Sequence, residues 1–126
     1  MEPLPASVLK GIAEFNRRDF FECHESIEEA WGEENGRVRV FYQGLIQVAV
    51  GCCHAQRGNL RGALDLLALG HQKLEPFAPS CQGVDVKGLL EQSGRLGDTL
   101  RRLGEGGLSG LDPAEFPVIR MEGAAP

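Results

Sequence analysis

The sequence predicts an all-α fold: a single-domain antiparallel bundle of about five helices with a Gly/Pro-rich C-terminal tail. The chain has 126 residues, 42% hydrophobic and 25% charged, which suits one globular domain. Almost every periodic segment repeats its apolar residues at helical spacing, and Gly, Asn and Pro punctuate the segments, which indicates short connections. We expect the bundle to span residues 1–104 and the tail residues 105–126.

The first two helices are predicted from about 7 to 16 and from 19 to 31. The first presents its apolar side through Val8, Ile12 and Phe15. Asp19 and Glu22 form a capping-box pattern, in which each side chain bonds an amide at the start of the second helix. A Gly-containing turn over 32–36 ends it.

The third helix, about 37–57, is apolar almost all round, so we expect it to be the central and most buried helix. Gly44 and Gly51 lie on one flank, where missing side chains let another helix approach closely. Arg57-Gly58-Asn59 ends this helix and caps a fourth, whose apolar face contains Leu60, Ala63, Leu64, Leu67 and Leu74.

Pro76 and Pro79 break the chain, and Asp85 is predicted to cap a fifth helix that reaches about Leu103. In the tail, residues 116–119 are expected to pack as an extended strap, while the chain ends are expected to be mobile.

Composition excludes several functional classes. The formal charge of −5 leaves no basic face for nucleic acid, and no apolar run is long enough to cross a bilayer. The N-terminal residues, with Glu2, Pro3 and Pro5, do not resemble a signal peptide. We therefore expect a soluble, cytoplasmic protein whose cysteines, Cys23, Cys52, Cys53 and Cys81, are small buried side chains.

The candidate site begins on the second helix. His24 falls inside an apolar stripe, and Glu28 lies on its margin one turn later, so the two side chains can meet. Glu22, Glu25 and Glu29 point to the opposite, solvated side. A polar pair on a core face must find partners or cost a few kcal/mol.

The third helix offers such partners, because Gln43, Gln47 and His54 share one narrow stripe. Placed against His24 and Glu28, this stripe would form a semi-buried pocket with Trp31 as a wall. His71, on the apolar face of the fourth helix, could add a third imidazole.

His24, Glu28 and His54 are suitable ligands for zinc, iron or manganese, with a position open for water and metal-assisted hydrolysis. Trp31, Gln43 and Gln47 would complete the pocket. The zincin motif is excluded, because Glu28 replaces its second histidine and Glu25 points outward.

Two other interpretations remain open. The pocket could bind a small polar ligand, or His24, Glu28 and the glutamines could be a satisfied core network with no ligand. In the second case we expect a non-enzymatic interaction module, with an apolar patch on the first or last helix that binds a protein partner or forms a homo-oligomer.

One segment of the second helix contains residues 20–25, Phe-Phe-Glu-Cys-His-Glu, followed by Glu28 and Trp31. This segment resembles the H-x-x-x-E-x-x-W signature of a prokaryotic family called domain of unknown function 309. The likeness continues through 41–47, His54 and 57–63, and covers about residues 8–75. It implies a small multihelical bundle of bacteria or archaea without an established activity. It also implies metal binding at His24 and Glu28.

Overall fold

The computed structural model describes residues 3–122 and confirms the all-α prediction. Within these residues there are five α-helices: α1 (Ala6–Asn16), α2 (Phe20–Glu33), α3 (Val38–Gln56), α4 (Leu60–Leu74) and α5 (Val86–Leu103). Three short 3₁₀ helices, η1 (Glu75–Phe77), η2 (Glu105–Gly110) and η3 (Pro113–Glu115), and two strands, β1 (Ser80–Cys81) and β2 (Val84–Asp85), complete the described chain. No helix in this part of the chain is long and apolar enough to span a membrane.

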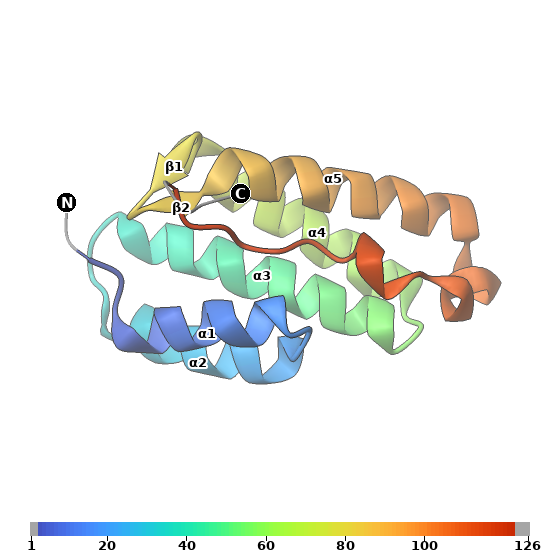
Figure 1. The fold of residues 1–126 in the computed structure, drawn as a ribbon, viewed down its shortest axis with the longest axis horizontal. Helices are drawn as coiled ribbons and strands as arrows, with labels where there is room; N and C mark the ends of the chain where they lie inside the picture. Colours follow the sequence, from blue (N-terminus) through green and yellow to red (C-terminus); the bar gives the residue numbers. More distant parts are fainter. Residues whose placement is uncertain (1–2, 123–126) are drawn as a thin grey trace.

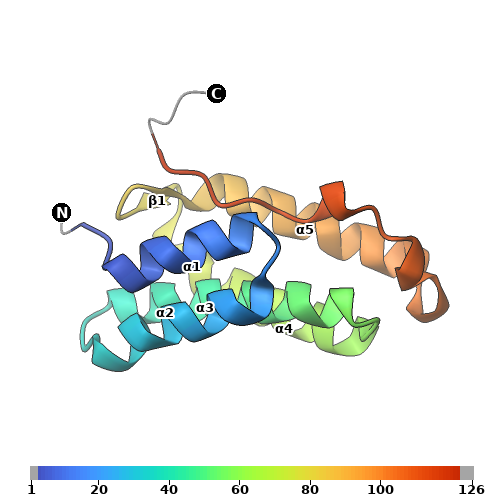
Figure 2. The same ribbon diagram turned by 60° about the horizontal axis from the view of Figure 1, so that its bottom comes forward.

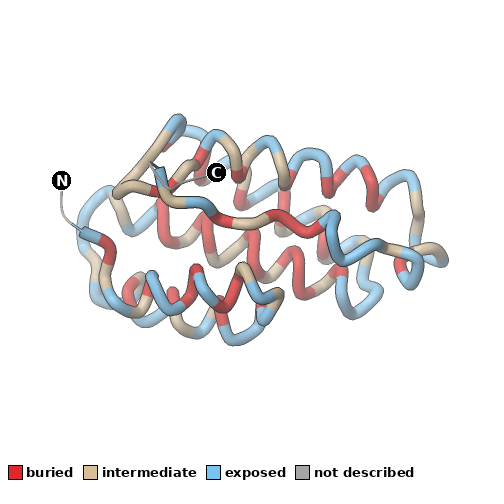
Figure 3. The backbone as a smooth tube through the Cα atoms, viewed as in Figure 1, coloured by how far each residue is buried: buried red, intermediate tan, exposed pale blue. Residues whose placement is uncertain are grey.

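The helices form two layers. α2, α3 and α4 lie side by side in one layer, and α1, α5 and the C-terminal segment lie over it on one side (Figures 1 and 2). Buried residues concentrate where the layers meet (Figure 3). The other side of the α2–α4 layer is covered by no described element (Figure 2).

α3 is the central helix, as predicted, and packs closely against α4. A Cβ atom added at Gly44 would lie 2.7 Å from the Leu74 side chain, and one added at Gly51 would lie 3.0 Å from Leu67. From the α4 side, a Cβ at Gly70 would lie 2.7 Å from the side chain of Val48. Glycines on both helices therefore allow the close approach that the sequence indicated.

Two of the three predicted helix caps are present. The Asn59 side chain accepts a hydrogen bond from the Gly62 amide at 2.9 Å, and Asp85 does the same for Gly88 at 2.9 Å. The predicted capping box of α2 is wrong. Asp19 occupies the N-cap position, but its side chain caps no amide and instead pairs with Arg17 at 3.2 Å.

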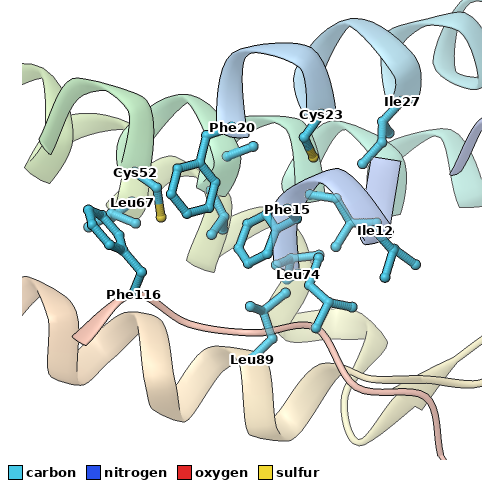
Figure 4. Packing of buried hydrophobic residues seen from close by; sticks show 14 of the residues in the cluster. Ile12, Phe15, Phe20, Cys23, Ile27, Cys52, Leu67, Leu74, Leu89 and Phe116 are labelled. Carbon is cyan, nitrogen blue, oxygen red and sulfur yellow. The ribbon is translucent and has the colours of Figure 1, made fainter. Parts of the chain in front are cut away.

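The segment after η3 packs as an extended strap between α1 and α5 (Figure 1). Phe116 and Ile119 are buried, and Phe116 lies near Phe20 in the core (Figure 4). The Asn16 side chain exchanges two hydrogen bonds with the Ile119 backbone, at 2.7 and 2.9 Å. Residues 105–122 thus pack onto the bundle, and the extreme ends of the expected mobile termini lie outside the described residues.

A two-residue hairpin between η1 and α5 has no counterpart in the sequence predictions. Ser80 pairs with Asp85 and Cys81 with Val84, around a turn in which Gln82 and Gly83 have positive φ. The short β-bridge between Val84 and Met121 ties the strap to this hairpin. Strands of two residues are too short to show a period of their own.

The cysteines are buried with one exception. Cys23, Cys52 and Cys53 lie in the core, as expected, whereas Cys81 is only partly buried. Burial raises the pKa of Cys23 to about 12 and raises that of Cys52 well above its ordinary value. Figure 4 shows Cys23 and Cys52 among the apolar side chains of the core.

Candidate functional site

The uncovered side of the α2–α4 layer carries the predicted site residues. Apart from its end residues Val38 and Gln56, the buried residues of α3 occupy one arc of the helix and its half-buried or exposed residues another, at 100° per residue. The second arc contains Arg39, Val40, Gln43, Ile46, Gln47, Val50 and His54. We call these seven residues, with His24, Glu28 and Trp31 of α2, the open face.

The apolar stripe predicted that His24 is buried in the core. The structure instead places it half-buried, at the edge of the core. Its Nδ1 lies in hydrogen-bond contact with the carbonyl of Phe21, and its ring meets the Phe21 ring edge-on with centroids 4.8 Å apart. Because a carbonyl only accepts, Nδ1 must carry the proton. The Nε2 of neutral His24 therefore keeps its lone pair.

Glu28 is exposed, which corrects the prediction of a half-buried carboxylate. In residues 3–122 its side chain forms no ion pair and no hydrogen bond with His24. The expected His24–Glu28 core network is therefore not formed. The two residues lie on the same side of the helix, 40° apart in rotation, so helical spacing allows the contact but the side chains do not make it.

Trp31 is clamped across the α2–α3 turn. The guanidinium of Arg39 lies 3.9 Å from the centroid of the indole ring, and Arg39 Nε donates to the Trp31 carbonyl at 3.2 Å. The indole Nε1 is covered and has no hydrogen-bond partner among the described residues. Trp31 is half-buried, so it both anchors the end of α2 and contributes to the open face.

The two glutamines are half-buried, and one of them is unsatisfied. Gln47 Oε1 is covered by protein atoms and has no partner in the part of the chain that the structure describes. An unpaired buried acceptor costs about 1–3 kcal/mol. Gln43 lies one turn away on the same half-buried arc of α3.

His54 is oriented by the cap of α4. Asn59 Oδ1 accepts from the Gly62 amide, so its Nδ2 is the group that lies 3.3 Å from His54 Nδ1. Since an amide nitrogen only donates, Nδ1 of His54 accepts, and neutral His54 carries its proton on Nε2. His24 and His54 are thus held as opposite tautomers.

His71 lies apart from the open face. Its Nε2 is 3.4 Å from the Glu75 carboxylate, a local partner that the sequence analysis did not foresee. Together with Ser93 and Arg101, His71 lines an open cavity of about 280 Å³ between α4 and α5. The structure therefore does not bring His71 to the other two histidines.

The described residues do not fit a metal centre as they are arranged. No group of three His, Cys, Asp or Glu residues within 3–122 could hold an ion. Glu28 is exposed, and a metal bound at His54 Nε2 would have to displace the proton that the Asn59 contact places there. Of the two histidines of the open face, only His24 presents an Nε2 with a free lone pair.

Sequence reasoning missed several residues of this surface. Arg39 stacks on Trp31, and the Arg57 guanidinium lies 5.6 Å from the Phe21 ring, so two arginine–aromatic contacts join α2 to α3. Ile46 and Val50 add the apolar part of the open face. The predicted antiparallel pairing of the two helices was the available signal, because it places Phe21 opposite the end of α3 and Trp31 opposite its start.

Comparison with known proteins finds a relative of this chain. A chain 41% identical over 91 residues is the uncharacterized protein YpuF of Bacillus subtilis (strain 168), and the match covers 69% of this chain and 52% of YpuF. The chain thus spans about half the length of that relative. No solved structure matches this chain.

Part of the chain also matches a family. Residues 8–66, which run from α1 into α4 and include every residue of the open face, match the family described as domain of unknown function 309 (DUF309). This helical region is thus similar to the DUF309 family, as the motif around His24 and Glu28 indicated.

Proposed function

We propose that the protein is a non-enzymatic interaction module that binds a partner polypeptide on its open face. The observation that carries the proposal is that the central helix α3 presents a half-buried row of residues that no described element covers. A central helix usually has its apolar sides covered. A partner chain would complete this one.

Exposed apolar side chains gather on the same side. The large apolar side chains that are exposed are Leu9, Phe21, Val40 and Leu69, and the last three belong to α2, α3 and α4. Val40 lies two turns before Gln47, and Phe21 two turns before Glu28. Leu69 lies two turns after Gly62, which faces His54. The apolar patch is therefore on the open face, whereas we had expected it on the first or last helix.

The unpaired polar atoms indicate which chemistry would fit. Trp31 Nε1 needs an acceptor and Gln47 Oε1 needs a donor, and a polypeptide supplies both in its amide groups. Both atoms belong to half-buried side chains of the open face. Pairing them on binding would recover the cost of leaving them unsatisfied.

Trp31 allows a direct test, because it is the only tryptophan and gives a single indole N–H signal in a ¹H–¹⁵N spectrum. Peptides selected from a random display library on the full chain should shift this signal. Gln47→Met should weaken their binding at least tenfold and leave the fold intact. The matched control is Gln72→Met, an exposed glutamine on α4, which should bind normally.

Two results would count against the module. Selected peptides that leave the indole signal unmoved would place binding elsewhere. Equal affinities for Gln47→Met and Gln72→Met would show that the open face does not contribute.

The metal site remains the second candidate, favoured by the free Nε2 of His24. It assigns zinc, iron or manganese to His24, Glu28 and His54, with hydrolysis by a bound water. Elemental mass spectrometry of protein purified without chelator tests it. Near-stoichiometric metal that is lost in His24→Ala would support the site, and metal-free protein that ignores added metal would reject it. A small polar ligand, the third possibility, would shift the Trp31 signal without any peptide.

A further inference from the structure

We propose that the segment bound by the open face is basic, with lysine or arginine side chains that meet the carboxylates of α2. This inference rests on the proposed function and names the chemistry of its partner. It starts from where the charge of the molecule lies.

The net negative charge of the chain comes from one helix and its following turn. Residues 20–36 contain six glutamates and no lysine or arginine. The full chain has 18 acidic and 13 basic residues, so the remainder has 12 acidic and 13 basic residues, a net charge of +1 against −6 for this segment. The α2 surface is therefore the main source of negative potential.

Within residues 3–122, five of these six carboxylates have no partner. Glu22, Glu25, Glu28, Glu29 and Glu33 are all exposed. The ion pairs within residues 3–122 involve other residues: Arg17 with Asp19, Arg61 with Asp65, His71 with Glu75 and Arg101 with Asp98. Only Glu34, at the end of the segment, accepts a hydrogen bond, from the Gly36 amide.

The cations nearest to this surface are held by other contacts. Arg39 stacks on Trp31 and donates to its carbonyl, and Arg57 lies over Phe21. Neither arginine reaches a carboxylate among the described residues. The acidic side chains beside the open face are thus left for a partner to neutralise.

Two of these carboxylates lie at or beside the open face. Glu28 belongs to the open face, and Glu25 lies three residues before it, on the solvent side of α2. A lysine or arginine of a bound segment can lay its aliphatic stem on exposed Phe21 and direct its charged end to these carboxylates. A second copy of this chain would bring like charges together, which disfavours self-association.

Two double variants with the same net charge test the inference. Glu25→Gln with Glu28→Gln removes two charges beside the open face, and Glu91→Gln with Glu105→Gln removes two exposed charges elsewhere. Peptides selected from the random library should carry a net positive charge. The first variant should lower their association rate about tenfold and flatten its salt dependence. The second should leave the rate within about twofold.

Each contrary outcome has a distinct meaning. If the selected peptides are neutral or acidic and their binding still requires Gln47, the inference of a basic partner is wrong, but the proposed interaction module stands. Equal rate losses in both double variants would show only a long-range effect of net charge and overturn the inference. Peptides indifferent to Gln47 would overturn the proposed function itself. A dimer in light scattering that Gln47→Met dissociates would replace the basic partner with a second copy.

Discussion

At the scale of single residues, one hydrogen bond decides what each histidine can offer. His24 Nδ1 faces a carbonyl and His54 Nδ1 faces an amide nitrogen, so the two rings expose opposite functions at Nε2. His24 offers an acceptor and His54 a donor. Such a pair suits a ligand with both a donor and an acceptor better than a metal ion, which needs two lone pairs.

Helical spacing predicted part of the open face, through His24, Gln47 and His54, but not how deeply each residue would lie. His24 is 40° from Phe20 around the helix, inside the apolar stripe, and is nevertheless half-buried. The depth of a residue depends on which neighbour covers that side of the helix. Here α1 and α3 cover Cys23 and Ile27 completely, while no element of the described chain covers the side of Glu28.

The buried thiols predict a loss of stability at alkaline pH. The ordinary cysteine pKa is 9.0, and burial raises that of Cys23 to about 12 and that of Cys52 well above 9.0. Ionisation therefore begins in the unfolded chain first. The contribution of the two protonated thiols to the free energy of unfolding is complete below pH 9. It is lost as the pH rises from 9 towards 12, by about 1.4 kcal/mol per pH unit for each thiol.

Urea unfolding at pH 8 and pH 10.5 would measure this loss. Cys23→Ala should unfold more easily at both values because of its cavity, but should lose less stability between them. A wild-type free energy of unfolding that is independent of pH, or an equal loss in Cys23→Ala, would contradict the prediction.

At the scale of elements, the pairing of α3 with α4 depends on glycines that the sequence identified. The bounds of all five helices follow closely from apolar periodicity and from breakers such as Gly58 and Pro76, because long periodic segments carry a strong signal. The α2 cap was misjudged, since Arg17, just before the helix, competes for Asp19. The hairpin at 80–85 was missed, because its turn uses Gln82 at positive φ, where Asn or Gly is usual.

Gly70→Ala should separate α3 from α4. Its Cβ would lie 2.7 Å from the Val48 side chain and 3.0 Å from the Val48 backbone nitrogen, and backbone cannot move aside cheaply. We expect a loss of about 1–3 kcal/mol in the free energy of unfolding, measured by urea denaturation.

Gly94→Ala is the matched control within α5. A Cβ there meets nothing within 4 Å, so alanine should stabilise the helix by about 0.5–1 kcal/mol. If both variants shifted stability in the same direction, the close approach at Gly70 would not be the cause.

At the scale of the whole molecule, the strap joins parts of the chain that are distant in sequence. Asn16 holds Ile119 from α1, and Gln92 holds Val118 from α5 through two hydrogen bonds of 2.9 and 3.0 Å. The apolar run at 116–119 indicated such packing. Its location could not be predicted, because an extended segment without a period shows no preferred face.

Phe116→Ala should destabilise the whole fold by about 3–5 kcal/mol, since its ring is buried against Phe20 with centroids 5.2 Å apart. Urea unfolding measures the loss, and hydrogen exchange should show faster exchange in both α1 and α5. Exposed Glu115→Ala is the control and should change stability by less than about 0.5 kcal/mol. A loss below about 1 kcal/mol for Phe116→Ala would mean that the strap contributes little.

The strap also has a consequence for how the chain folds during synthesis. The hydrogen bonds between Asn16 and Ile119 span 103 residues, whereas the contacts among α1, α2, α3 and α4 join neighbours in sequence. The neighbouring helices can assemble while the chain is still being translated, but α1 gains its last hydrogen bonds only after residue 119 has left the ribosome. A chain that stops before residue 116 would therefore lack these hydrogen bonds and would leave the ring of Phe20 without its contact with Phe116.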